Sequence, residues 1–127
     1  MRVGQSVMME LDLGLQRCKP CHKGEIPLGP ESVQGYLSQL PGWKRSGKRI
    51  ARTYSFKDFY ETMSFVNAVA YIANGEGHHP ELEVGFQTCR VRYFTHELGG
   101  LTENDFICAA KIDGLLKETK DGFWPVN

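Results

Sequence analysis

The sequence predicts an α+β fold in which a four-stranded antiparallel sheet carries three helices on one face. Three segments show the three- and four-residue spacing of apolar side chains that is typical of helices. Between these helices lie two pairs of short segments that have the pattern of hairpin strands. Gly or Pro residues separate the segments. The resulting order, helix, two strands, helix, two strands, helix, is that of a layered α+β domain.

Composition narrows the class of protein. The chain has 127 residues, 41% of them hydrophobic and 24% charged, which suits one globular domain. Lys and Arg together number 15, as do Asp and Glu, so no basic surplus favours a nucleic-acid partner. No apolar run reaches the roughly 18 residues that span a membrane. Residues 1–16 include Glu10 and Asp12 and lack the apolar core of a secretory signal. We therefore expect a cytoplasmic protein with reduced cysteines.

Residues 1–29 form a predicted N-terminal extension, and residues 30–127 form the predicted domain. Gly and Pro punctuate the extension too often for a long helix or strand. It holds a Cys-x-x-Cys-His run, Cys18 to His22, which matches covalent haem attachment and also supplies three metal ligands. Haem attachment needs export, and a zinc site needs a fourth ligand. We interpret the pair as part of a structural loop, with a metal or redox role as the alternative.

The first helix and hairpin are predicted after Pro30. Pro suits the first turn of a helix, and Pro41-Gly42 ends this one. Its apolar residues follow helical spacing: Val33, Tyr36, Leu37 and Leu40. Residues 43–45 and 48–54 then read as two strands joined by a turn at Ser46-Gly47.

The longest predicted helix begins at a capping box formed by Ser55 and Asp58 and ends near Asn74-Gly75. Its apolar residues recur at helical intervals and predict a core-facing stripe. The stripe consists of Phe59, Met63, Val66, Ala70 and Ala73, widened by Phe65, Val69 and Ile72.

Two strands and a last helix follow. Leu82, Val84 and Phe86 alternate with polar residues or Gly, and Cys89, Val91 and Tyr93 alternate with arginines. Continuing that alternation places His96 off the apolar face, at the end of the strand. Thr102 is the predicted N-cap of the last helix, with Asp105 completing a capping box. We expect this helix to end at Asp121-Gly122, before the apolar tail Phe123-Trp124-Pro125.

Three of the four histidines, His78, His79 and His96, fall near these strands. Imidazole titrates near neutral pH, so the cluster predicts proton transfer. A zinc site is the alternative. Adjacent residues of an extended segment point in opposite directions, which makes it difficult for His78 and His79 to bind one ion.

The motifs together resemble those of the pterin-4a-carbinolamine dehydratase family. The similarity extends over about residues 30–117 and preserves the spacing of His78-His79-Pro80, Phe86, His96 and Asp105. Three further stretches are similar: Leu40-Pro41-Gly42-Trp43, Phe65-Val66-Asn67, and the run from Thr95 to Asp105.

The resemblance implies a fold, an activity and a set of site residues. The fold is a four-stranded antiparallel sheet with three helices on one side, in dimers or tetramers. The activity is removal of water from 4a-hydroxytetrahydropterin, the product of aromatic amino-acid hydroxylases, to give quinonoid dihydropterin, with no metal or other cofactor. Such a hydroxylase is the implied partner. By position, His78 and His96 are the acid–base pair, and the substrate-binding residues are His79, Asp105, Phe86 and Thr95.

One position departs from the family pattern. Members often have an ionisable residue four positions before the first histidine, where this chain has Asn74. A carboxylate beside an imidazole raises its pKa, so Asn74 leaves open which histidine is the acid. Some members act as transcriptional coactivators or assembly factors, and a non-catalytic binding module is therefore the alternative function.

Overall fold

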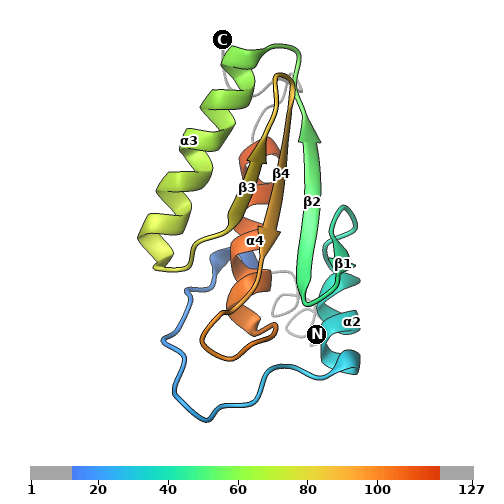
Figure 1. The fold of residues 1–127 in the computed structure, drawn as a ribbon, viewed down its shortest axis with the longest axis vertical. Helices are drawn as coiled ribbons and strands as arrows, with labels where there is room; N and C mark the ends of the chain where they lie inside the picture. The colour runs from blue at the N-terminus through green and yellow to red at the C-terminus, as the bar shows by residue number, and fades with distance from the viewer. Residues whose placement is uncertain (1–12, 118–127) are drawn as a thin grey trace, which may run out of the picture.

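The computed structural model describes residues 13–117, in which the predicted order of helices and strands is confirmed (Figure 1). A short 3-10 helix, η1 (Leu13–Leu15), precedes it. The other elements are α2 (Pro30–Leu37), β1 (Lys44–Ser46), β2 (Arg49–Ser55), α3 (Phe59–Glu76), β3 (Glu81–Val84), β4 (Thr88–Tyr93) and α4 (Glu103–Lys117). The predicted end of the last helix and the apolar tail lie outside the described residues. Within residues 13–117, no helix is long and apolar enough to cross a membrane.

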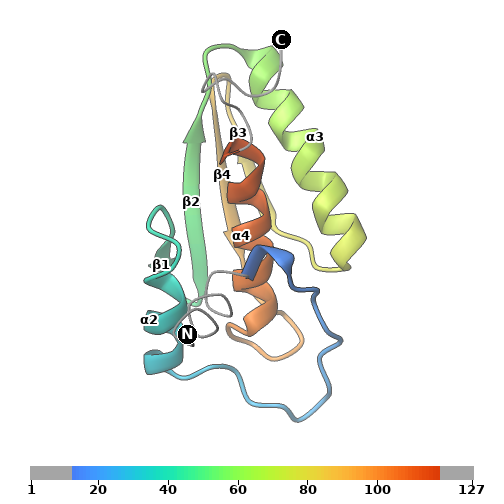
Figure 2. The ribbon, with the colours of Figure 1, turned by 180° about the vertical axis from the view of Figure 1, so that it is seen from behind.

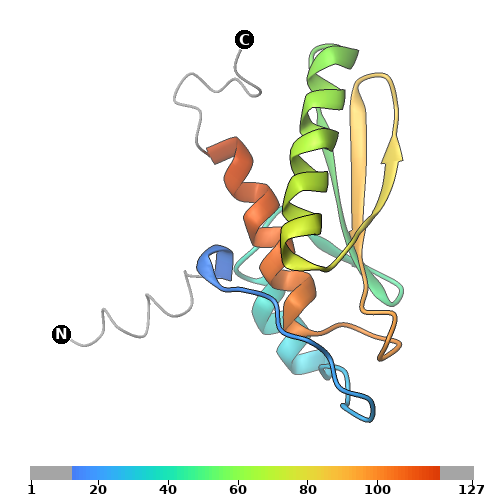
Figure 3. The same cartoon turned by 90° about the vertical axis from the view of Figure 1, so that its left-hand side faces the viewer.

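The four strands form one antiparallel sheet in the order β1-β2-β4-β3. Helices α3 and α4 cover one of its faces, as Figure 3 shows from the side. Because β3 and β4 are antiparallel neighbours, the residues just before β3 and just after β4 meet at one end of the sheet. The β3–β4 turn lies at the other end. The confirmed topology therefore brings His78, His79 and His96 to the same end of the sheet.

The alternation predicted for β4 is confirmed. Cys89, Val91 and Tyr93 are fully buried, whereas Arg90 and Arg92 on the opposite face are partly exposed. The buried side of the sheet packs against the apolar faces of α3 and α4, which contribute Phe65, Val69, Phe106, Ile107 and Ile112 to the core.

The predicted N-cap of α3 is wrong. Ser55 is the last residue of β2, where it pairs with Thr88, so it does not cap the helix. The N-cap is Asp58, whose side chain accepts a hydrogen bond of 2.9 Å from the Glu61 amide. Strand pairing thus extends β2 to Ser55, and the helix begins at Phe59.

The core-facing stripe of α3 is also rotated from the predicted one. Thr62, Phe65, Val69 and Ala73 are buried, whereas Phe59 is 49% exposed and Ala70 is exposed. Apolar residues occur around most of this helix, so the spacing alone allowed more than one buried face. Contact with the sheet and α4 selects the face that includes Phe65.

A buried polar cluster joins the sheet to the last helix. The Asp113 carboxylate on α4 accepts hydrogen bonds from the Trp43 indole at 3.2 Å, the Arg52 guanidinium at 2.8 Å and the Tyr54 hydroxyl at 2.6 Å. These three donors satisfy the carboxylate oxygens, which burial would otherwise leave without hydrogen-bond partners.

The segment between η1 and α2, residues 16–29, is named here the N-terminal strap. It runs past the end of the sheet where the histidines lie and past the first turn of α4 (Figures 2 and 3). The Leu28 amide donates a hydrogen bond of 2.8 Å to the Leu101 carbonyl, which fixes the strap beside the start of α4. The division of the chain at residue 29 remains a prediction, because strap and domain are in contact.

Candidate active site

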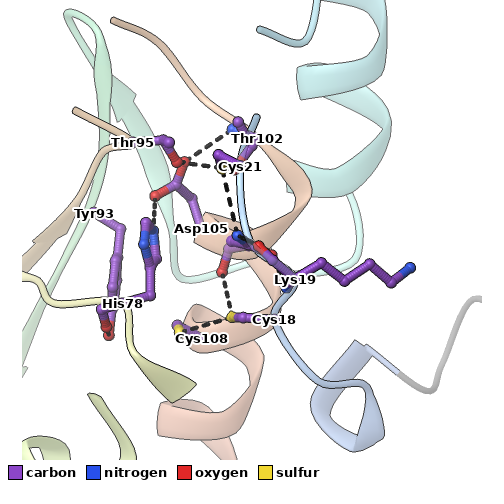
Figure 4. Close-up of polar contacts among 10 residues, drawn as sticks. Cys18, Lys19, Cys21, His78, Tyr93, Thr95, Thr102, Asp105 and Cys108 are labelled. Carbon is purple, nitrogen blue, oxygen red and sulfur yellow. Dashed lines mark hydrogen bonds and ion pairs between the residues drawn. The ribbon is translucent and has the colours of Figure 1, made fainter. Parts of the chain in front are cut away.

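A buried histidine–carboxylate pair lies at the end of the sheet. The Nε2 atom of His78, just after α3, is 2.6 Å from Oδ1 of Asp105, in the first turn of α4 (Figure 4). The Asp105 side chain is fully buried, and the His78 side chain is 11% exposed. Gly77 forms the C-cap of α3 with φ of 67°, and this left-handed turn directs the chain from the helix to His78. Residues 27 positions apart are thus brought into direct contact.

The Asp105 carboxylate is held by two further donors. Its Oδ2 accepts hydrogen bonds from the Thr95 hydroxyl at 2.7 Å and from the Thr102 amide at 2.9 Å. The second bond is the return contact of the predicted capping box. The Thr102 hydroxyl instead pairs with the Thr95 hydroxyl at 2.8 Å. Asp105 therefore caps α4, as the capping box predicts, and contacts His78 at the same time; its predicted contact with substrate stays untested.

The pKa of His78 is raised above its ordinary value. Burial alone lowers this pKa, but the hydrogen bond to Asp105 and the negative charge of that carboxylate outweigh the effect of burial. A carboxylate only accepts, so His78 carries a proton on Nε2, and Nδ1 is the nitrogen left to exchange a proton. The position occupied by Asn74 is exposed, so in this chain Asp105 provides the carboxylate partner of the first histidine.

Tyr93 supports the same imidazole from the sheet. Its ring is stacked on the His78 ring with centroids 5.2 Å apart, and its hydroxyl donates a hydrogen bond of 3.1 Å to the His78 carbonyl. No sequence pattern indicated a functional role for Tyr93, because it belongs to the apolar set of β4. The stacked ring restricts the plane of the imidazole, and the bond to Asp105 fixes the direction of its Nε2 atom.

The other predicted site residues lie at different places. Thr95 is buried beside Asp105, whereas His79 and His96 are exposed near the same end of the sheet. The His96 ring lies edge-on to the Phe94 ring, with centroids 4.7 Å apart. Phe86 is 69% exposed in the β3–β4 turn, stacked on Phe59 at the opposite end. Within one chain, Phe86 is thus remote from the His78–Asp105 pair, and its predicted substrate contact stays untested.

The N-terminal strap lies beside the His78–Asp105 pair, a position that the sequence did not predict. Asn104, one residue before Asp105, exchanges two hydrogen bonds with the Lys19 backbone, at 3.0 and 2.7 Å. Glu76 accepts from the Cys18 amide at 2.8 Å and pairs with Arg17 at 2.9 Å. Its pKa is lowered because the bond from the Cys18 amide and the nearby cations outweigh the effect of burial.

A hollow of about 580 Å³ lies between the strap and the start of α4. Its lining combines charged and apolar side chains, among them Lys19, His22, Leu98 and Glu103. Thr102 also lines it, so the hollow adjoins the His78–Asp105 pair. Among residues 13–117, no group of three or more His, Cys, Asp or Glu side chains is arranged to hold a metal ion.

A family model described as pterin 4 alpha carbinolamine dehydratase matches residues 26–115. The chain belongs to this family. A relative from Nitrosomonas eutropha, provisionally named a pterin-4-alpha-carbinolamine dehydratase, is 55% identical over 83% of this chain and 94% of its own length. A relative from Legionella pneumophila with the same provisional name is 52% identical over 85% of this chain and 98% of its own length. Membership of the pterin dehydratase family confirms the resemblance found in the sequence.

Two solved structures share the fold. A transcriptional coactivator/pterin dehydratase from Brucella melitensis superposes with a TM-score of 0.67 at 30% identity, over 69% of this chain and 96% of that one. A pterin dehydratase-like protein, described as a RuBisCO assembly factor in the alpha-carboxysome, gives a TM-score of 0.50 at 24% identity, over 57% of this chain and 87% of that one. The second likeness shows the fold alone.

Proposed function

We propose that this protein removes water from 4a-hydroxytetrahydropterin to give quinonoid dihydropterin, with His78 and His96 as its acid–base pair. The observation that carries the proposal is the 2.6 Å contact between His78 Nε2 and the buried Asp105 carboxylate, in a member of a dehydratase family. Loss of a hydroxyl from a carbinolamine needs an acid for the leaving oxygen and a base for the proton released as the double bond forms. Two imidazoles supply both near neutral pH.

The geometry favours His78 as the acid. Its raised pKa keeps the imidazolium populated at higher pH than that of an isolated histidine, because Asp105 stabilises the charged form. In the proposal, His78 donates the Nδ1 proton to the leaving hydroxyl, and water departs. His96 accepts the proton released from the pterin, and the exposed His79 binds the ring system. Thr95 and Asp105 act by holding His78 in place. Phe86 lies at the opposite end of the sheet, so it contacts the substrate only when the β3–β4 turn of a second copy of the chain packs beside the site.

The test is steady-state dehydration of synthetic 4a-hydroxytetrahydropterin. His78→Ala and His96→Ala should each slow the enzyme, since general acid–base groups contribute about 10²–10⁴-fold. Spontaneous collapse of the carbinolamine sets a lower limit on the rate. The double variant should be scarcely slower than the slower single variant, because the groups act as a unit. His79→Ala should mainly raise KM.

The control is Gln34→Ala, which removes an exposed polar side chain of α2 that does not line the hollow. It should retain the parent rate. Circular dichroism checks that each variant is folded. Full activity in a folded His78→Ala/His96→Ala double variant would refute the proposed mechanism while leaving the family assignment untouched.

The proposal includes the source of the substrate, the location of the enzyme and its oligomeric state. The reaction's substrate arises from aromatic amino-acid hydroxylation, so such a hydroxylase is the proposed supplier, in the cytoplasm and within tetrahydrobiopterin recycling. A homo-oligomer is proposed as well. Strand β3 is at one edge of the sheet; its last residue, Val84, is 43% exposed, and Phe86 in the following turn is 69% exposed. Light scattering on the purified chain distinguishes a monomer from the dimer or tetramer proposed.

A binding role is the second candidate function. The observation favouring it is the Brucella melitensis structure, which is described as a transcriptional coactivator as well as a pterin dehydratase. Helix α3 also exposes Tyr60 and Tyr71, at 73% and 82%. A folded chain without dehydratase activity would favour this candidate.

A further inference from the structure

The N-terminal strap holds one cysteine against α4. The amide of Cys18 is bonded to Glu76, and the next residue, Lys19, is bonded twice to Asn104. These bonds fix the backbone on both sides of the Cys18 side chain. The Cys18 Sγ lies 3.5 Å from the Sγ of Cys108, which is fully buried on α4 (Figure 4).

The sequence motif suggests a different partner. In a Cys-x-x-Cys run the expected pair is Cys18 with Cys21. In the structure, the Cys21 Sγ instead lies 3.7 Å from the Asn104 side-chain nitrogen. The thiol aimed at Cys18 comes from a residue 90 positions later in the chain. We propose that Cys18 and Cys108 are an oxidisable pair, which closes to a disulfide that ties the strap to α4.

The surroundings of the pair make its two thiols unequal. The hydrogen bond with Cys18 lowers the pKa of the Cys108 thiol, and the Tyr93 hydroxyl and the charge of His78 add to this effect against the opposing effect of burial. The pKa of Cys18 is raised by its hydrogen bond with Cys108 and by burial. The thiolate is the reactive form, and the oxidant also needs access to it. Cys108 has the lowered pKa but is fully buried, whereas Cys18 has the raised pKa but is half-buried, so either sulfur can be the first to react.

The oxidant is a hydroperoxide, for which hydrogen peroxide is the smallest example. The thiolate of one cysteine of the pair attacks a peroxide oxygen, the O–O bond breaks, and hydroxide leaves, so this cysteine becomes a sulfenic acid. The sulfur of the other cysteine then attacks the sulfenic sulfur and the S–O bond breaks. The proton of the second thiol joins the departing hydroxide as water. The two sulfurs lose two electrons in total, and these reduce the peroxide.

The Cys18–Cys108 disulfide would restrict movement of the N-terminal strap and leave its position nearly unchanged. The strap already lines the hollow beside Thr102, and the two sulfurs are already in contact. Cross-linking residues so far apart in sequence restricts the unfolded chain and prevents the strap from leaving α4. This inference does not depend on the proposed dehydratase activity.

The experiment treats the full, reduced chain with hydrogen peroxide and counts free thiols by alkylation and mass spectrometry. The wild type should lose two of its four thiols and regain both on reduction. Trypsin places Cys18 and Cys108 in separate peptides, so the bond appears as a linked pair of peptides. Cys21→Ser is the matched control and should form the same link. Cys18→Ser should lack the link.

Three results would overturn the proposal. One is a wild type that keeps all four thiols under peroxide. The second is a bond between Cys18 and Cys21 that forms equally in Cys108→Ser. The third is a link between the same two tryptic peptides that persists in the Cys18→Ser variant, which would assign it to Cys21. Because Cys18 is only half-buried, its serine variant tests the pair even if the buried Cys108→Ser variant fails to fold.

Discussion

Replacing Asp105 with asparagine is the sharpest test of the histidine–carboxylate pair. The carboxylate accepts three hydrogen bonds, at 2.6 Å from His78 Nε2, 2.7 Å from the Thr95 hydroxyl and 2.9 Å from the Thr102 amide. Asparagine keeps the shape but has one acceptor oxygen and one NH₂ group. If the oxygen keeps the two threonine contacts, the NH₂ group faces His78, which then has to accept through an unprotonated Nε2.

The expected loss follows from these contacts. A hydrogen bond to a charged partner contributes about 1.5–3 kcal/mol, and this one is buried. Asp105→Asn should therefore lower the free energy of unfolding by about 1.5–3 kcal/mol in the pH range where His78 is protonated, and the Tm by roughly 5–15 °C. The threonine contacts stay satisfied in the proposed orientation and add little to the loss.

The stabilisation by the His78–Asp105 pair depends on pH. The pKa of His78 is raised in the folded protein, so its contribution to stability is complete below the unfolded value of about 6.5. That contribution is lost as the pH rises through the folded pKa. The destabilisation by Asp105→Asn should thus be largest near pH 6 and smaller near pH 9, and the pKa of His78 should fall.

Urea denaturation at pH 6 and pH 9 measures the first effect, and NMR titration of the His78 ring measures the second. Thr102→Ser is a conservative control that keeps the amide bonded to Asp105 and should leave the His78 pKa unchanged. A loss of stability that is equal at both pH values, together with an unchanged His78 pKa, would refute the reasoning.

Two further predictions concern the framework. Asp113→Ala leaves three buried or half-buried donors unpaired and should cost about 3 kcal/mol in urea denaturation, whereas alanine at the exposed Glu83 should cost less than about 0.5 kcal/mol. An equal loss in both variants would contradict the role of the buried cluster. Gly77→Ala should cost about 1–2 kcal/mol because its φ is 67°, while Gly75→Ala within α3 should stabilise the protein slightly, by up to about 1 kcal/mol. The same sign for both glycine variants in thermal unfolding would contradict the capping role.

The sequence determined the fold class and the end of the sheet where the histidines meet. Period-two alternation placed Cys89, Val91 and Tyr93 on one face of β4, because side chains of a strand point to opposite faces in turn. Antiparallel pairing of β3 with β4 then required His78 and His96 to lie at the same end. The motif spacing also identified the family, since spacing over separated positions survives changes in the residues between them.

The local sequence pattern did not predict the structure correctly where two arrangements fitted it equally well. Phe59 and Phe65 both fit a helical stripe, and only contact with the sheet buried Phe65. Ser55 fits an N-cap, but pairing with Thr88 kept it in β2. Both errors arise because tertiary contacts contribute more free energy than a single cap or one phase of an apolar stripe.

The partners of the site residues were decided by tertiary structure alone. Asp105 was recognisable as a helix cap, but its contact with His78 depends on how α4 docks against the end of α3. In the same way, the thiol beside Cys18 belongs to Cys108, 90 residues away, and not to its sequence neighbour Cys21. Sequence records which chemical groups are available and their local spacing. Which groups meet is set by the close fit of helices, sheet and strap, whose contacts join residues from distant parts of the chain.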